Sequence, residues 1–128
     1  MRALLDTHAL LWWLAGDERL SPAAHDLIAN ESTEIFVSAA SVSEVVTKHR
    51  IGKLPHVGPL VVDFARVLQS QQFIGLAISI DHAQTAGALR DANRDPFDRM
   101  LISQAMLEKM ALVSNERSFD AFPITRVW

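Results

Sequence analysis

Short apolar segments alternate with amphipathic segments along the chain, and this alternation is the strongest constraint on its fold. The apolar segments 2–5, 35–38, 76–80, 111–114 and 124–127 are typical of short buried strands. The segments between them show helical spacing of apolar residues. Consecutive parallel strands joined by a helix form right-handed crossovers. The sequence therefore predicts an α/β protein with a parallel sheet between helices.

Helix boundaries are indicated by residues that cap or break helices. Ser21 followed by a proline marks the start of one helix, and Gly16 and Gly52 mark the ends of two others. A further proline opens a long helix after Asp95. On these signals we expect helices at 7–14, 22–30, 39–51, 59–71, 81–89 and 96–110.

Composition limits the class of protein. A chain of 128 residues with 49% hydrophobic content is long enough for one packed domain, which we expect to span residues 1–128. The absence of cysteine excludes disulfides, thiolate zinc sites and a cysteine nucleophile, and it suits a reducing cytoplasm. The longest apolar runs are far shorter than the roughly 18 residues of a membrane span, and we expect neither such a span nor a signal peptide.

Four acidic residues lie where apolar segments end: Asp6, Glu44, Asp98 and Glu116. The carboxyl ends of parallel strands meet at one edge of the sheet, which is where ligands usually bind in open α/β folds. Carboxylates gathered there repel one another, so a cation is needed to neutralise them. Oxygen ligands suit a hard divalent cation. These positions predict a metal-dependent enzyme.

Helix capping is the alternative interpretation of each acid taken singly. Asp6 and Asp95 can serve as N-caps, and Ser41 with Glu44 fits a capping box. Asp98 then stands at the third position of its helix, where the helix dipole favours an acid. Capping does not require all these acids to follow strands at one edge, so their joint spacing favours a metal site.

The formal net charge of −3 argues against a protein that coats nucleic acid by bulk electrostatics. It does not exclude an enzyme that acts on a phosphodiester, because local basic patches and bound cations can offset the acids. Both candidate patches have a bland alternative, which is solvated helix surface. The first patch contains Lys48, Arg50 and Lys53, and the second contains Arg90, Arg94 and Arg99.

Several motifs together resemble a known family. They are the run LLDTHALLWWLA at 4–15, VSAASVSE at 37–44, RDPFDRML at 94–101, LVS at 112–114 and the terminal Val127-Trp128. In this order and spacing the chain resembles a PIN-domain ribonuclease of the VapC toxin type. The resemblance covers essentially the whole chain. It implies a three-layer α/β/α sandwich with a parallel sheet and an acidic pocket that binds Mg²⁺ or Mn²⁺.

The resemblance also implies roles for individual residues. Its first, second and third acids correspond to Asp6, Glu44 and Asp98. The fourth is commonly Asp in a T-x-D pattern, whereas this chain has Ser114-Asn-Glu116. Ser thus replaces Thr and Glu replaces Asp, which makes the role of the fourth acid the least defined. Asp95 is typical of this branch and is expected to support the ligands as well as to cap.

The implied activity is endonucleolytic cleavage of RNA, often a structured RNA such as tRNA, by a metal-activated water. Arg94 or Arg99 would steady the RNA backbone, and Lys48, Arg50 and Lys53 would form its approach surface. The implied partners are a cognate antitoxin, which would insert a C-terminal segment into the acidic pocket, and a second copy of the chain. We expect a homodimer, in part because one helix cannot bury both Trp12 and Trp13.

Two other classes remain as alternatives. The first is a non-catalytic α/β interaction module whose acids are only helix caps, with Trp12, Trp13 and Trp128 as partner anchors. The second is a Mg²⁺-dependent phosphatase, which is disfavoured because no D-x-D pair follows the first strand.

Overall fold

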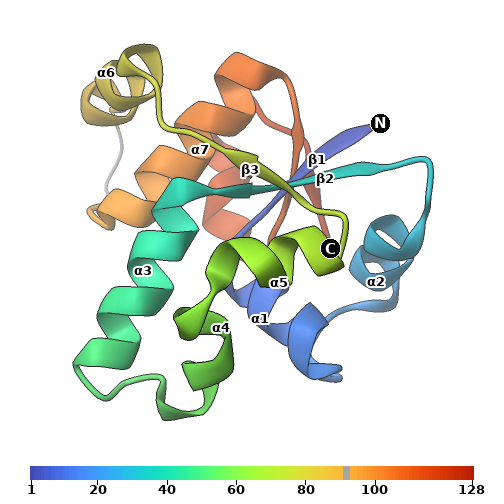
Figure 1. The fold of residues 1–128 in the computed structure, drawn as a ribbon. Coiled ribbons are helices and arrows are strands. Elements are labelled where there is room, and N and C mark those ends of the chain that lie inside the picture. The colour runs from blue at the N-terminus through green and yellow to red at the C-terminus, as the bar shows by residue number, and fades with distance from the viewer. Residues whose placement is uncertain (91–92) are drawn as a thin grey trace.

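A computed structural model of the protein describes residues 1–90 and 93–128. Five parallel strands form one sheet in the order β3-β2-β1-β4-β5. The predicted parallel α/β sheet is confirmed (Figure 1). The strands are β1 Arg2–Leu5, β2 Glu34–Ser38, β3 Ile74–Leu76, β4 Ala111–Val113 and β5 Arg126–Val127.

Helices cover both faces of the sheet. Successive residues of a strand point to opposite faces, and β1 shows the result: Ala3 and Leu5 belong to one apolar core, and Leu4 to the other. The first core contains side chains of the helices between residues 7 and 70, and the second is formed mainly against the helix at 96–108. The α/β/α sandwich is therefore confirmed. The helices are α1 Thr7–Ala15, α2 Pro22–Ala29, α3 Ala39–Arg50, α4 Gly58–Val62, α5 Phe64–Ser70, α6 Ile80–Ala88 and α7 Pro96–Glu108, with 3₁₀ turns η1 Pro55–Val57 and η2 Arg117–Ala121.

The third strand lies earlier in the chain than the sequence predicts. The apolar run 76–80 was expected to be the strand, but β3 is Ile74–Leu76 and Ile80 already belongs to α6. Ser79 is the N-cap of α6, and its side chain accepts from the His82 amide, while the His82 ring accepts from the Ser79 amide. This reciprocal pair starts the helix within the apolar run, and it leaves Ile80 85% exposed.

The predicted helix 59–71 is two helices. Asp63, with φ −149° and ψ 78°, leaves the helical conformation between α4 and α5. Its side chain accepts from the Arg66 amide and so caps α5. The break preserves the inward positions of Leu60, Phe64 and Leu68, all of which are buried.

The alternative interpretation of Ser41 and Glu44 as a capping box does not apply to α3. The N-cap of α3 is Ser38, whose hydroxyl accepts from the Ala40 amide. Ser41 and Glu44 therefore lie inside the helix, where both are buried. Capping does not explain Glu44.

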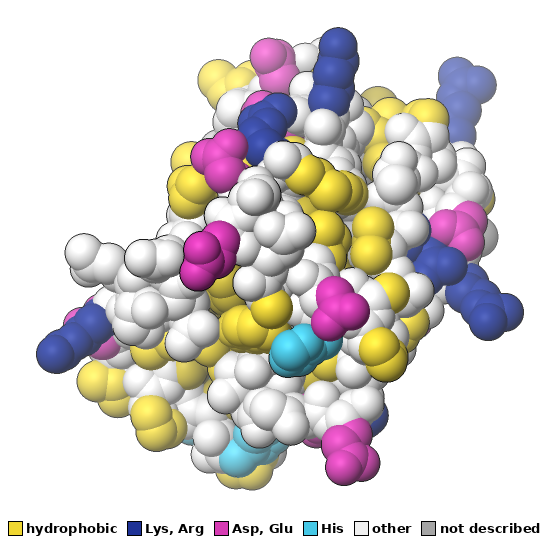
Figure 2. Space-filling model, turned by 90° about the vertical axis from the view of Figure 1, so that its right-hand side faces the viewer, with side chains coloured by type: hydrophobic (Ala, Val, Ile, Leu, Met, Phe, Trp, Pro, Cys, Tyr) yellow, Lys and Arg dark blue, Asp and Glu magenta, His cyan; other side chains and the backbone are white. Residues whose placement is uncertain are grey.

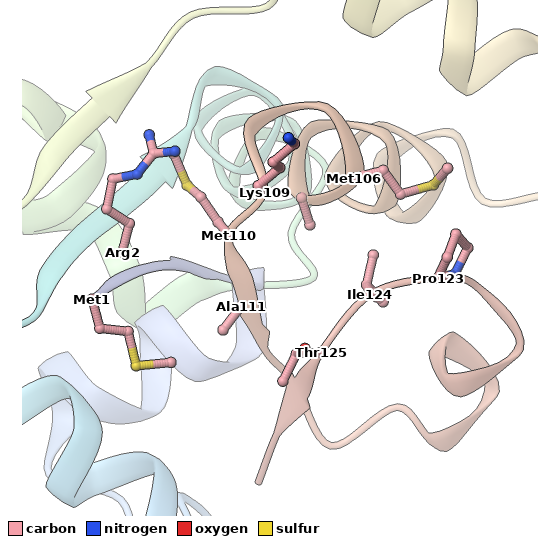
Figure 3. A pocket seen from close by; sticks show the side chains of 10 residues that line it. Met1, Arg2, Met106, Lys109, Met110, Ala111, Pro123, Ile124 and Thr125 are labelled. Carbon is pink, nitrogen blue, oxygen red and sulfur yellow. The ribbon is translucent and has the colours of Figure 1, made fainter.

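The two edges of the sheet differ in character. At the amino edge a cavity of about 470 Å³ lies beside the starts of β1 and β4, with Met1, Arg2, Met106 and Lys109 around it (Figure 3). Among the residues that the structure describes, none of those lining this cavity carries a carboxylate. Asp6 and Ser114 directly follow β1 and β4, and Ser38 is the last residue of β2, so all three lie at the opposite, carboxyl edge. Within the described residues, no helix has the length and apolar character needed to cross a bilayer.

Candidate active site

Asp6 is a buried carboxylate at the end of the central strand. It is only 6% exposed, and its main-chain amide bonds the carbonyl of Val113 on β4. Its side chain caps α1 by accepting from the Ala9 amide at 2.8 Å. Burial raises the pKa of Asp6, while bonds from the Ser114 hydroxyl and the Ala9 amide oppose the rise. Asp6 is therefore both a cap and a costly buried charge.

Glu44 approaches the same edge from the middle of α3. The Thr7 hydroxyl donates to its Oε1 at 2.6 Å and also lies 3.1 Å from the Ser41 hydroxyl. Lys48, one turn later on α3, places its Nζ 2.5 Å from Oε2 of Glu44. Both oxygens of this buried carboxylate thus have hydrogen-bond donors.

Asp98 comes from the first turn of α7. Asp95 is the N-cap of this helix and accepts from the amides of Phe97 and Asp98, at 2.8 and 3.3 Å. Asn93 joins the two aspartates, since its side-chain oxygen accepts from the Asp95 amide and its Nδ2 lies 3.4 Å from Oδ2 of Asp98. Asp95 is exposed, whereas Asp98 is half-buried.

The three carboxylates influence one another. Burial and the charges of Asp95, Glu44 and Asp6 together raise the pKa of Asp98 to about 6, against a lowering by the Asn93 hydrogen bond. The charge of Glu44 also raises the pKa of Asp6. Residues 6, 44 and 98, which lie on three separate elements, therefore share one electrostatic neighbourhood at the carboxyl edge, in agreement with the spacing in the sequence.

The chemistry of this group fits a hydrated hard cation. It offers carboxylate oxygens, and two of its members have raised pKa values that a positive charge would lower. In the described part of the chain, no three His, Cys, Asp or Glu side chains are already arranged around a common metal position. Mg²⁺ keeps several waters and is commonly bound by only one or two carboxylates. The residues therefore fit an ion held in part through water.

Ser114 and Glu116 have different surroundings. Ser114 is fully buried, donates to Asp6 and accepts from the Glu116 amide at 3.0 Å. The Glu116 carboxylate is exposed and accepts from the Ser118 hydroxyl at 3.2 Å. Ser114 thus contacts Asp6 directly, whereas the Glu116 side chain bonds to Ser118, two residues later in the chain.

The basic residues named from the sequence fall into two sets. Lys48 is paired with Glu44, and Arg99 donates to main-chain carbonyls within its own half of the chain. Arg50, Lys53, Arg90 and Arg94 are exposed. On the face of the molecule in Figure 2, basic side chains stand apart near the margins and form no continuous patch.

Trp12 and Trp13 pack within the protein. Trp12 stacks on His8 with ring centroids 5.4 Å apart and lies 5.7 Å from Trp128, and the Arg19 guanidinium lies 5.0 Å from its ring. Trp13 donates to Gln71 at 3.0 Å. Both indoles are half-buried. One helix therefore accommodates both tryptophans by packing them against different neighbours.

Sequence reasoning missed Thr7 and Asn93 as partners of the acids. Thr7 follows Asp6 directly in the sequence, and a hydroxyl side chain next to a site acid was the available signal. In the structure Thr7 is buried. Asn93 stands two residues before the helix cap Asp95, a spacing typical of Asx turns. Neither signal identifies the carboxylate that the side chain contacts. For Thr7 that carboxylate belongs to Glu44, 37 residues away in the sequence.

Comparison with known proteins identifies related chains. A sequence model of the PIN domain family matches residues 3–124. Ribonuclease VapC22 of Mycobacterium tuberculosis is 30% identical over 130 residues, which cover 98% of this chain and 97% of the relative.

Solved structures share the fold at lower identity. DNA-bound VapBC from Salmonella typhimurium has a TM-score of 0.71 and 18% identity, covering 98% of this chain and 96% of its own. VapBC2 from Rickettsia felis, bound to a promoter DNA fragment, has a TM-score of 0.68 and 16% identity, covering 98% and 97%. VapC20 from M. tuberculosis, described as a Sarcin-Ricin loop cleaving toxin, has a TM-score of 0.66 and 17% identity, covering 93% of both chains.

Proposed function

This chain belongs to the PIN domain family, and on that premise we propose that it is a metal-dependent endoribonuclease of the VapC toxin type. Its proposed metal ligands are Asp6, Glu44 and Asp98, and the proposed ion is Mg²⁺ or Mn²⁺. The predicted resemblance to VapC toxins is confirmed by the curated relative, which is named as a ribonuclease. The proposed domain is residues 1–128.

One observation carries this proposal. Carboxylates from β1, α3 and α7 share an electrostatic neighbourhood at the carboxyl edge, and the pKa of Asp98 is raised to about 6 there. Helix capping accounts for Asp95 and for part of Asp6, but it leaves Glu44 unexplained, because Ser38 caps α3. Titratable groups perturbed by burial and by like charge are typical of catalytic sites.

Different residues are proposed to hold the cation and to orient the acids. Bound at this edge, a divalent cation supplies a water of lowered pKa and stabilises charge on the scissile phosphate. Thr7 and Ser114 orient Glu44 and Asp6 through their hydroxyls. Asn93 supports Asp98, and Asp95 holds the first turn of α7. Glu116 is proposed as a more distant acid, since its side chain is exposed.

The RNA would approach along exposed basic side chains. We propose Arg94 as a backbone contact, with Arg50 and Lys53 at the end of α3 as the approach surface. Lys48 has a second role through its pair with Glu44. Structured RNA such as tRNA is the proposed substrate class. A few phosphate contacts are enough to position the RNA for cleavage of one phosphodiester bond. Such a small number of basic contacts is compatible with a net charge of −3.

Two protein partners are proposed. The first is a cognate antitoxin, supported by solved VapBC neighbours, and its insertion of a Lys or Arg among the acids would neutralise the same charges as the cation. The second is another copy of the chain. Val62 and Ile80, at 86% and 85% exposure, are apolar side chains that contact with a second copy could cover.

The test of the proposed function compares two substrates. Purified protein is incubated with structured RNA and, separately, with a phosphomonoester, with Mg²⁺ and with excess chelator. We expect RNA cleavage that needs the cation and no phosphomonoester turnover. Phosphomonoester turnover without RNA cleavage would indicate the phosphatase class. A protein that is inactive on both substrates and binds no metal would indicate the interaction module.

A further inference from the structure

The Arg99 guanidinium donates to four main-chain oxygens. Its Nε donates to Ala86 at 3.0 Å, Nη2 to Gly87 and Leu89 at 3.3 and 2.7 Å, and Nη1 to Asn93 at 2.9 Å. Four of the five N–H groups of the side chain are used in this way. A group bound so completely has little capacity left for RNA phosphate.

These acceptors lie where a helix needs cations. Ala86 and Gly87 belong to the last turn of α6, and Leu89 is its C-cap. The last carbonyls of a helix have no partner within it, and cations are favoured there. Arg99 itself lies in the first turn of α7. One side chain therefore joins the end of α6 to the start of the helix that carries Asp98.

The fourth acceptor extends this connection to the acidic site. The Asn93 carbonyl is held by Arg99, while the Asn93 side chain reaches Oδ2 of Asp98 at 3.4 Å and the Asp95 amide at 2.9 Å. Fixing the main chain at Asn93 fixes where its amide group can point. The position of Asp98 thus depends, through Asn93, on the side chain of Arg99.

We propose that Arg99 is a positioning residue, which holds Asn93 so that Asp98 and the N-cap Asp95 are set for cation binding. This proposal rests on the proposed function for its link to catalysis. It assigns Arg99 a role different from RNA contact. Lysine cannot replace it, because an ammonium offers three donors from one point and cannot span four carbonyls.

The test measures cation affinity and cleavage kinetics for Arg99→Lys, which keeps the charge. Calorimetry with Mn²⁺ should show about 10–100-fold weaker binding, the usual effect of removing a partner that orients a ligand. RNA cleavage should show a comparable loss in kcat with KM unchanged. Asn93→Ala should lower Mn²⁺ affinity in the same direction, and Arg99→Lys should then add little to it, as expected for residues that act through one path.

Two further variants separate positioning from other effects. Glu108→Ala removes the 2.9 Å bond to His82 at the far end of the α6–α7 contact, about 15 Å along the helix from Asp98. It should lower Tm without changing Mn²⁺ affinity. Arg94→Ala removes an exposed proposed phosphate contact and should raise KM and reduce the salt dependence of binding, with kcat retained.

Each outcome decides between roles for Arg99. Raised KM with normal kcat and Mn²⁺ affinity in Arg99→Lys would show an RNA contact and overturn the proposal. Equal loss of affinity in Glu108→Ala would show general destabilisation and overturn it as well. If wild type binds Mn²⁺ without cutting RNA, only the proposed function fails, and the affinity ratios still decide the role of Arg99. If wild type binds no Mn²⁺, both proposals fail.

Discussion

Lys48 Nζ lies 2.5 Å from Oε2 of Glu44, one turn earlier on α3, so a positive side chain already neutralises one of the three site acids. The pair is asymmetric, because Glu44 is buried and Lys48 reaches solvent. Lysine and a divalent cation would compete for the same carboxylate.

Lys48→Met should leave Glu44 as a buried charge without its strongest partner. Without added metal, we expect the variant to be less stable than wild type by about 1 kcal/mol. Saturating Mg²⁺ should then stabilise the variant more than it stabilises wild type. Thermal melts with Mg²⁺ and with chelator measure both effects. Arg66→Met, a change on the exposed surface of α5, is the control. A Lys48→Met melt that resembles the control under both conditions would contradict the competition.

Asp98 should make the protein less stable as pH rises. Its pKa is raised from 3.8 to about 6 in the folded state, so folding favours the protonated form. The stabilising contribution is therefore complete below pH 3.8 and is lost as pH rises through about 6.

The variant Asp98→Asn lacks this titration. In chelator it should match wild type near pH 3.5 and exceed it by about 1–3 kcal/mol at pH 7. Urea unfolding at the two pH values gives the difference, and a constant offset between the proteins at both would refute the shift. Mg²⁺ should narrow the gap at pH 7 by stabilising wild type alone.

Variants of Asp95 should distinguish its role as a helix cap from a role in RNA cleavage. Asn caps a helix about as well as Asp, so Asp95→Asn should keep stability, whereas Asp95→Ala should lose about 1 kcal/mol. Because the charge of Asp95 raises the pKa of Asp98, Asp95→Asn should also lower that pKa below 6. Carboxyl NMR titration follows the shift directly. Both variants should retain measurable RNA cleavage. An inactive Asp95→Asn beside an active Asp98→Asn would reverse the assignment of the third ligand.

Thr7→Val tests the orientation of Glu44. The change preserves shape but removes the hydroxyl that donates to Glu44 at 2.6 Å. We expect a loss of about 1–3 kcal/mol, since a buried acceptor loses a partner, together with weaker Mn²⁺ binding. Thr7→Ser keeps the hydroxyl and serves as the matched control. Unchanged metal affinity in Thr7→Val would remove Thr7 from the site.

Much of the fold could be predicted because local signals agree with burial. β1 coincides with the apolar run at 2–5, and the helices after Asp6, Ser21 and Asp95 begin where these capping residues predict. The errors arise where two signals compete. In 76–80 apolar alternation suggested a strand, but the Ser79 cap started α6, and at Asp63 a cap divided an otherwise continuous helical pattern.

The candidate site could be predicted less completely. The end of β1 indicated Asp6, because the carboxyl ends of parallel strands lie at the edge where ligands usually bind. Glu44 and Asp98 come from inside α3 and from the first turn of α7, so the directions of these helices bring them toward Asp6. Partners such as Lys48 for Glu44, and carbonyls for Arg99, depend on side-chain directions that spacing does not specify. Local hydrogen bonding therefore determined the roles of the basic residues.

The most direct test is RNA cleavage by Asp6→Asn. Asparagine can still cap α1 and removes the cost of a buried charge, so circular dichroism should show a folded protein with a Tm at or above that of wild type. The amide cannot replace the charge that holds a divalent cation. We predict that Asp6→Asn leaves structured RNA intact in Mg²⁺ that supports full cleavage by wild type. Cleavage by folded Asp6→Asn at the wild-type rate would contradict the metal-dependent site at this edge of the sheet.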